Sequence, residues 1–94
     1  GTTPLLLASG LEHTEMAKLL LQKGADVDIS DKELNLPIHI ACYNGDLQLV
    51  TELIDHGADL FKKTLKGNLP LAIAVNCEHH EVVKYLYNKI YSNS

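Results

Sequence analysis

Two groups of residues have the types that metal binding or covalent catalysis would need. The first is Glu78-His79-His80-Glu81, the one run in the sequence that resembles a metal site. A zinc-binding pair on a helix places its ligands four residues apart on one face, whereas adjacent histidines on a helix point about 100° apart. This spacing disfavours a metal site, and we expect the chain to need neither a metal nor another cofactor.

The second group is His39 and Cys42, which lie three residues apart and could touch on one helix. A cysteine nucleophile needs a nearby base, and a third group usually orients that base. No acid is placed to orient His39, and Cys42 follows the small residue Ala41, which favours a buried, unreactive thiol. We therefore expect no catalytic residues and no enzyme activity in this chain.

A repeat organises the elements that carry these residues. Proline occurs at positions 4, 37 and 70, alanine at 8, 41 and 74, and leucine at 20, 53 and 86, always at the same interval. The triplet Gly-Ala-Asp occurs at 24–26 and again at 57–59. A fixed period of this length indicates stacked repeats. We divide the single domain 1–94 into units of approximately 1–30, 31–63 and 64–94, the first of which lacks its leading residues.

Each unit is expected to hold two helices. Proline suits the first helical position, Thr3 and Thr14 are candidate N-caps, and Gly24 and Gly57 are typical of left-handed residues after a helix. The expected helices run from Pro4 to near Leu11, from about Thr14 to just before Gly24, from Pro37 to Asn44, from Leu47 to Asp55, from Pro70 to about Cys77 and from His80 to about Tyr91.

Two patterns predict which apolar side chains are buried. The second helices of the outer units carry apolar positions that favour one broad packed face: Met16, Ala17, Leu19, Leu20 and Leu21 in the first, and Val82, Val83, Tyr85, Leu86 and Tyr87 in the third. Tyr91 is the tyrosine that we expect to be exposed. Leu5, Leu6, Leu7 and Leu11 cannot all face the second unit, so apolar surface should stay open at the N-terminal end and favour self-association.

Several of these residues resemble a known repeat. Thr3-Pro4-Leu5, Pro37-Ile38-His39-Ile40-Ala41 and the two Gly-Ala-Asp triplets are similar to the ankyrin repeat. That repeat is a β-turn and two helices in about 33 residues. The resemblance covers essentially the whole chain and implies an all-α ankyrin-repeat solenoid of stacked helix-turn-helix units with β-turn fingers. The signature threonine remains only as Thr3 and the signature histidine only as His39, so individual units should be weakened without a change of fold.

The same resemblance implies a function. In ankyrin folds the turns project as fingers and, with the first helices, line a concave groove that binds another protein. Tyr43 is a large amphipathic ring at a partly exposed position, which suits an interface anchor or a shield over the helix junction. The implied contact residues are Lys32, Glu33, Asn35, Tyr43, Asn44, Leu65, Lys66, Asn68, Asn76 and Cys77. The alternative is a regulatory or substrate-positioning segment of a larger enzyme or channel.

The composition limits which partners and which cellular compartment we expect for this chain. The formal net charge of −4 argues against a nucleic-acid or anionic-membrane surface, which would need clustered lysine and arginine. No apolar run approaches the roughly 20 residues of a membrane span, so we expect no membrane insertion. Cys42 and Cys77 are the only cysteines and occupy different repeat positions, which fits a reducing compartment. We therefore expect an intracellular, cytoplasmic protein.

Overall fold

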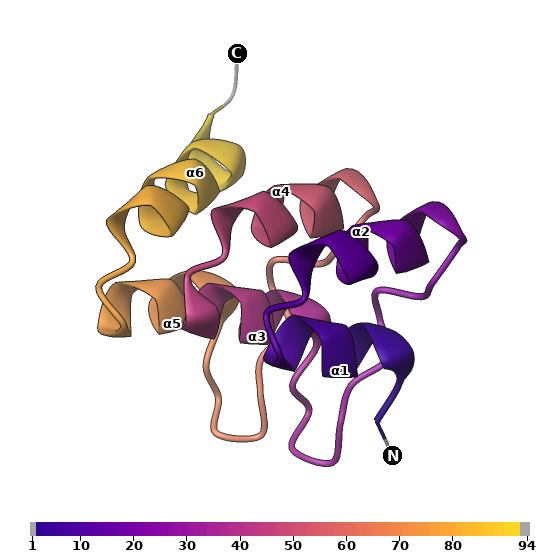
Figure 1. Cartoon of the computed structure of the whole chain (residues 1–94). Helices are drawn as coiled ribbons and strands as arrows, with labels where there is room; N and C mark the ends of the chain where they lie inside the picture. Colours follow the sequence, from indigo (N-terminus) through magenta and orange to yellow (C-terminus); the bar gives the residue numbers. More distant parts are fainter. Residues whose placement is uncertain (1, 93–94) are drawn as a thin grey trace.

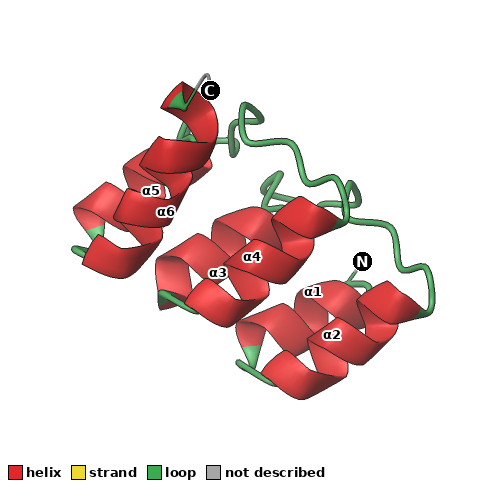
Figure 2. Cartoon of the chain, turned by 90° about the horizontal axis from the view of Figure 1, so that it is seen from above, coloured by secondary structure: helices red, strands yellow, loops and turns green. Residues whose placement is uncertain are grey.

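The computed structural model describes residues 2–92, which form three pairs of helices standing in one row (Figures 1 and 2). This part of the chain holds no β-strand, and the fold is the expected all-α solenoid. The helices are α1 (Pro4–Gly10), α2 (Thr14–Gln22), α3 (Pro37–Asn44), α4 (Leu47–Asp55), α5 (Pro70–Asn76) and α6 (His80–Tyr91).

The solenoid has two layers. Helices α1, α3 and α5 form an inner layer, and α2, α4 and α6 form an outer layer (Figure 1). Each helix contacts its partner in the pair and the next helix of its own layer. Two hairpin turns project below the inner layer in Figure 1. We call them the first finger, residues 31–35, and the second finger, residues 64–68.

Proline begins every inner helix, as predicted. Pro4, Pro37 and Pro70 each occupy the first turn of their helix, where the missing N–H leaves no hydrogen bond unmade. Thr3 also acts as predicted, because its Oγ1 accepts a hydrogen bond of 3.1 Å from the backbone N–H of Leu6. These local signals fix where the inner layer starts.

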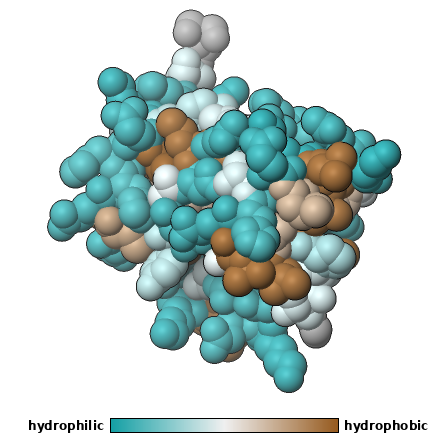
Figure 3. Space-filling model, viewed as in Figure 1, coloured by the Kyte–Doolittle hydropathy of each residue, from teal (hydrophilic) through white to brown (hydrophobic). Residues whose placement is uncertain are grey.

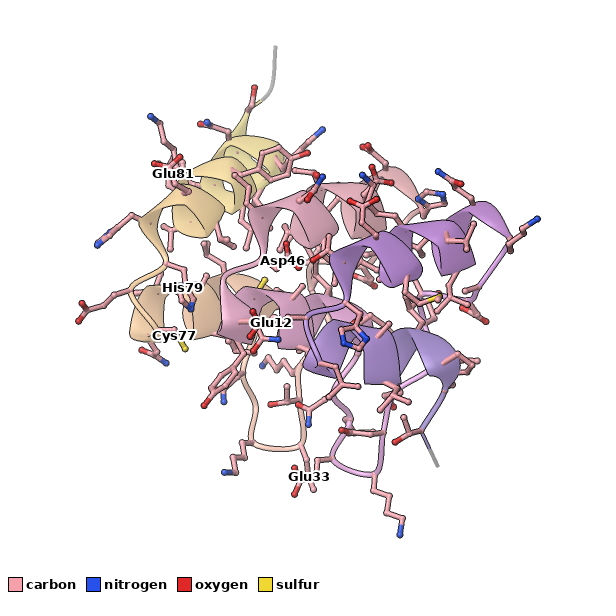
Figure 4. The ribbon with its side chains drawn as sticks, in the orientation of Figure 1. Glu12, Glu33, Asp46, Cys77, His79 and Glu81 are labelled. Carbon is pink, nitrogen blue, oxygen red and sulfur yellow. The ribbon has the colours of Figure 1, made fainter. Side chains whose placement is uncertain are left out.

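Thr14 does not cap α2, so that prediction was wrong. It is the first residue of the helix, and the N-cap residue His13 makes no capping bond through its side chain. The Thr14 hydroxyl instead donates to Oδ2 of Asp46. Oδ1 of Asp46 accepts from the backbone N–H of Leu49 at 3.2 Å and so caps α4. One carboxylate therefore caps its own helix and ties it to the preceding pair, at the place that Figure 4 labels Asp46.

Left-handed residues shape both kinds of turn. Gly24 and Gly57 follow the outer helices with φ of 92° and 93°, as predicted. The turn inside each pair also needs positive φ, which Gly45 supplies at 73°. Glu12 and Glu78 occupy the same repeat position with φ of 58° and 59°. A residue with a side chain is strained at positive φ. Two of these three turns therefore adopt a positive φ at a glutamate, where glycine would be less strained.

The core lies between the layers and repeats with the sequence. Ala8, Ala41 and Ala74 are all buried, and a small side chain at this position lets neighbouring inner helices approach closely. Leu53 of α4 and Leu86 of α6 are completely buried, and the equivalent Leu20 of α2 is half-buried. The same contact is thus made again in successive pairs, which is the condition for a stable stack.

The predicted apolar faces are only partly correct. Met16, Leu19 and Tyr87 are exposed, although the helical pattern placed them on packed faces. Leu7 and Leu11 are also exposed, in line with the expectation that not all four N-terminal leucines face the second pair. These side chains lie on the first and third pairs, each of which has a neighbouring pair on one side only in the described chain.

Candidate functional site

The first finger is held by one carboxylate. Oδ1 of Asp31 accepts hydrogen bonds of 2.9 Å from the backbone N–H groups of Glu33 and Asn35, and Oδ2 accepts from the Asn35 side chain at 3.1 Å. Burial acts to raise the pKa of Asp31, but these bonds and the nearby His39 outweigh it and hold the pKa below its usual value. The charged form therefore stabilises the finger. Leu34 completes the turn with a φ of 62°.

The second finger is held by a longer hydrogen bond, which involves a hydroxyl group instead of a carboxylate. The hydroxyl of Thr64 accepts from the backbone N–H of Asn68 at 3.3 Å, in place of the aspartate of the first finger. Gly67 supplies the positive φ of 84° that the turn requires. The two fingers are joined directly, because the backbone N–H of Leu65 donates to the carbonyl oxygen of Glu33 at 2.9 Å. They therefore form a continuous edge instead of two separate loops.

His39 anchors the fingers to the inner layer. Its Nδ1 accepts from the backbone N–H of Leu36 at 3.0 Å, and its Nε2 donates to the carbonyl oxygen of Lys62 at 2.8 Å. Both nitrogens are thus used by the neutral ring. Burial lowers the pKa of His39, against smaller raising effects of the Lys62 carbonyl and the Asp31 charge. The side chain is a structural tie between two turns.

A cavity of about 360 Å³ opens between the two fingers and the helices α3 and α5. Six of the ten predicted contact residues line it: Glu33, Asn35, Tyr43, Leu65, Lys66 and Asn68. Tyr43 and Leu65 are the large apolar side chains most open to solvent there, at 66% and 67% exposed. Figure 4 shows Glu33 at the end of a finger, away from the helices.

The other four predicted contact residues lie outside this cavity. Lys32 lines a separate hollow of about 330 Å³ with Thr2, Asp31 and Glu33. The side-chain amide of Asn44 donates to the carbonyl oxygen of Ser9 at 3.1 Å, so it joins α3 to α1. Asn76 is exposed and Cys77 half-buried at the end of α5.

Four cavity residues were not predicted as contacts: His39, Ile40, Thr64 and Ile73. Ile40 and Ile73 are one repeat apart and form the apolar floor beneath the fingers. The recurrence of an aliphatic residue at this position, which Leu7 shares, is the signal that would have found them. Thr64 could not be recognised from the repeat, because the equivalent residue of the first finger is Asp31.

Comparison with known proteins identifies the family. Residues 5–94 match a family profile described as Ankyrin repeats (3 copies). The chain belongs to the ankyrin-repeat family. Ankyrin repeats are generally protein-interaction modules and are generally non-catalytic. The fingers described above are the β-turns of this repeat.

Several proteins that are similar to this chain are much longer than it. Ankyrin repeat domain-containing protein 63 of Mus musculus is 33% identical over 92% of the chain and 23% of its own length. NF-kappa-B inhibitor alpha of Gallus gallus is 44% identical over 57% of the chain and 17% of its own length. Tyrosine-protein kinase HTK16 of Hydra vulgaris is 29% identical over 94% of the chain and 12% of its own length. The chain thus spans less than a quarter of the length of each of these three relatives.

The residues weighed for catalysis occupy structural positions in this ankyrin fold. Cys42 is completely buried, and burial, with a smaller effect of Cys77, raises the pKa of its thiol to about 12. The thiol is therefore protonated at neutral pH and is a poor nucleophile. His39 uses both ring nitrogens to hold backbone groups. Neither side chain is free to act on a substrate.

The adjacent residues His79 and His80 have different surroundings. His79 precedes α6, and its Nε2 lies 2.9 Å from the carbonyl oxygen of Tyr43, whereas His80 is exposed. Figure 4 shows His79 beside the end of α3. Among residues 2–92, no three His, Cys, Asp or Glu side chains are grouped as metal ligands would be. None of the described helices has the length and apolar character needed to cross a bilayer.

Proposed function

We propose that this chain is a non-catalytic module that binds another protein through the face formed by its fingers and inner helices. The observation that supports this most is the convergence of Glu33, Asn35, Tyr43 and three further predicted residues on one cavity. They come from two fingers and a helix, so one partner segment placed there would touch two adjacent repeats. The general role of ankyrin repeats supports the same interpretation.

The chemistry of the cavity fits a protein partner. Its floor is aliphatic, at Ile40 and Ile73, and its rim carries the opposite charges of Glu33 and Lys66. The side chain of Asn68 also lines it and has no hydrogen-bond partner among the described residues. A carboxamide offers both a donor and an acceptor, as a peptide group requires. An apolar floor with a polar rim is the usual composition of a protein interface.

Tyr43 is the proposed anchor of this surface. A tyrosine that is exposed in the free protein and becomes buried in a complex contributes much of the binding energy at many interfaces. Because Tyr43 is 66% exposed, its truncation should leave the fold intact. The convex face offers matched controls at Thr51 and Asp55 on α4.

The experiment is a pull-down with this chain, followed by calorimetric titration of the captured protein. Tyr43→Ala should weaken binding by about 1–3 kcal/mol, while Thr51→Ala and Asp55→Ala should change it by less than about 0.5 kcal/mol. Circular dichroism of each variant controls for folding. If the convex variants abolish binding and Tyr43→Ala binds normally, the partner docks on the outer helices and the proposal fails.

The second candidate function is a regulatory or substrate-positioning segment of a larger enzyme or channel. The similarity to a tyrosine-protein kinase of Hydra vulgaris favours it, because 94% of the chain aligns with only 12% of that protein. The sequence that flanks residues 1–94 in the parent transcript would distinguish the two. A catalytic or membrane domain there would support this candidate, and further units of the same period would support the first.

We also propose an intracellular, cytoplasmic setting and a partner that is not a nucleic acid. Cys42 and Cys77 form no disulfide, and unpaired thiols are typical of a reducing compartment. The net charge of −4 disfavours a polyanion as partner. Fractionation of cells that express the parent protein tests the first point, and recovery in a secreted fraction would contradict it.

A further inference from the structure

The two fingers close with the same backbone hydrogen bond. In the first finger the N–H of Asp31 donates to the carbonyl oxygen of Asn35 at 3.1 Å. In the second finger the N–H of Thr64 donates to the carbonyl oxygen of Asn68 at 3.0 Å. The two asparagines are also one repeat apart in the sequence. They therefore occupy equivalent places, each at the end of its finger.

The side chains of the two asparagines are bonded differently. The carboxylate of Asp31 has two oxygens, so Oδ1 accepts from the backbone N–H of Asn35 and Oδ2 accepts from its side-chain amide at 3.1 Å. Thr64 has a single side-chain oxygen, which accepts from the backbone N–H of Asn68 at 3.3 Å. Among the described residues, the carboxamide of Asn68 has no hydrogen-bond partner. A hydroxyl in place of a carboxylate thus leaves free the group that the first finger keeps bonded.

The free carboxamide lies in the cavity between the fingers. Asn68 lines this cavity together with the aliphatic residues Ile40 and Ile73. A carboxamide holds N–H donors and a carbonyl acceptor, so it can pair with the C=O and the N–H of a peptide backbone. The backbone groups inside a helix are already bonded to each other, whereas those of an extended segment are open to a partner. An extended segment is therefore the form of partner that fits Asn68.

The rim of the cavity carries charges of both signs. Glu33 and Lys66 occupy the same repeat position on neighbouring fingers, and both are exposed. The single ion pair among the described residues joins Lys18 to Glu15, so the two rim charges are not paired with each other. Hydrophilic side chains predominate at the lower edge of the molecule, where the fingers project (Figure 3). A segment that crosses both fingers is complementary to this rim when it carries one basic and one acidic side chain.

Building on the proposed function, we propose that the cavity binds an extended peptide segment whose backbone is hydrogen-bonded by Asn68. The segment places an aliphatic side chain on the floor formed by Ile40 and Ile73, and its two charged side chains face the rim. Asn68 is then a specificity-determining residue that Thr64 leaves available. The equivalent Asn35 is occupied in holding its own finger.

A phage-displayed library of random peptides supplies the probe. Peptides of about twelve residues span about 40 Å when extended, which exceeds the 32 Å long axis of the molecule. Selection on the wild-type chain, after removal of peptides that also bind Tyr43→Ala, retains those that use the cavity. The enriched peptides should share an aliphatic residue and, within about four positions, a basic and an acidic residue. That spacing follows because neighbouring repeats stand about 8–10 Å apart and extended residues about 3.3 Å apart.

Calorimetry with a synthetic copy of an enriched peptide then tests Asn68. Asn68→Ala should weaken binding about tenfold, because the backbone bonds of the peptide are lost. The matched control is Asn88→Ala, which changes an exposed asparagine of α6 and should leave the affinity unchanged. Circular dichroism checks that both variants fold.

Thr64→Asp tests the mechanism without a change at Asn68. The new carboxylate should bind the Asn68 amide as Asp31 binds that of Asn35, so peptide affinity should fall about tenfold while the thermal midpoint rises. A variant that merely damaged the finger would lose both. When Asn68→Ala is added to Thr64→Asp, binding should weaken no further, because both changes remove the same bonds. If Thr64→Asp fails to fold, Asn68→Asp replaces it, since a carboxylate without N–H donors should also weaken binding about tenfold.

The results separate this inference from the proposed function. Peptides that require Tyr43 but bind Asn68→Ala and Thr64→Asp as tightly as the wild-type chain overturn the inference and leave the proposed function standing. Losses that add in the double variant also overturn it, because Thr64→Asp then acts without Asn68. A library that yields no Tyr43-dependent peptide overturns it as well, whereas a whole protein whose binding Tyr43→Ala weakens would still support the proposed function.

Discussion

The imidazole of His79 lies directly over the Cα of Gly45. A Cβ added at Gly45 would sit 2.7 Å from both Cγ and Cε1 of that ring, which is closer than any relaxed contact. The ring is held there by its Nε2, 2.9 Å from the carbonyl oxygen of Tyr43. The residue before α6 thus closes over the turn of the preceding pair, and the turn has room for nothing larger than glycine.

Gly45→Ala should therefore destabilise the protein more than the same change at Gly57. Both positions have positive φ, and a side chain there costs about 1–2 kcal/mol. Gly57 has no atom within 4 Å of an added Cβ, so Gly57→Ala, or Gly57→Val with somewhat more strain, carries only the backbone cost. Gly45→Ala also displaces His79 and should lose roughly 1 kcal/mol more. Urea denaturation measures both, and equal losses would show that the His79 ring moves freely.

Glu12→Gly should stabilise the protein. Glu12 has a φ of 58°, and relief of that strain, about 1–2 kcal/mol, outweighs the extra freedom that glycine gives the unfolded chain, about 0.5–1 kcal/mol. The expected gain in the free energy of unfolding is up to about 1 kcal/mol. The matched control is Glu15→Gly inside α2, which should lose about 1 kcal/mol. A loss at both positions would contradict the positive φ at Glu12.

Thr14 and Asp46 should be energetically coupled. Thr14→Val removes one hydrogen bond and should cost about 0.5–1.5 kcal/mol, whereas Asp46→Ala also removes the cap of α4 and should cost about 1–2 kcal/mol. Because the bond between them is lost in either single variant, the double variant should cost less than the sum. A double-mutant cycle by denaturation measures the difference. Strict additivity would mean that the bond contributes nothing.

Stability should fall as the pH drops below about 6.5. Burial lowers the pKa of His39 in the folded protein, while the unfolded chain takes up its proton near the ordinary value of about 6.5. The stabilisation from neutral His39 is complete above that pH and is lost as the pH falls below it. NMR titration should give His39 a pKa below 6.5, and His39→Gln should flatten stability between about pH 7 and pH 5. His80→Gln is the exposed control. An unchanged slope in His39→Gln would assign the effect to other groups.

Removal of metal ions should leave the fold unchanged. His79 is turned toward the Tyr43 carbonyl and His80 toward solvent, so the two cannot share an ion in this arrangement. Thermal melts followed by circular dichroism, with and without EDTA, should have the same midpoint. Loss of helicity with EDTA that zinc restores would refute this.

Local sequence signals predicted most of the fold. Pro37 with Gly45, and Asp46 with Gly57, bracket α3 and α4, whose bounds were predicted to the residue. Such signals act within a few residues of the chain, so they can be read without knowledge of the packing. The constant period then predicted the stacking, because equivalent positions in successive units can make equivalent contacts.

The errors came from contacts between pairs. Helical periodicity shows that Met16 and Tyr87 lie on apolar faces, but not whether a neighbouring pair covers them. Thr14 has the residue type of an N-cap, yet its hydroxyl binds a carboxylate 32 residues away. The hydrogen bond from the Asn44 side chain to the Ser9 carbonyl oxygen was likewise not predicted, and Asn44 as a partner contact stays a prediction. In each case the deciding neighbour is distant in sequence.

The restriction of substantial helix contacts to the same or the adjacent pair bears on how such a chain can evolve. Recombination that duplicates or deletes one whole period, beginning at any point of the repeat, rejoins surfaces of the kinds that Leu21 and Leu49 present to each other. An insertion of any other length brings together helix faces from positions of the repeat that do not fit each other. We therefore expect the fold to tolerate the gain or loss of a whole period better than an insertion of another length, and an exchange of whole repeats would replace a finger without disturbing the stack.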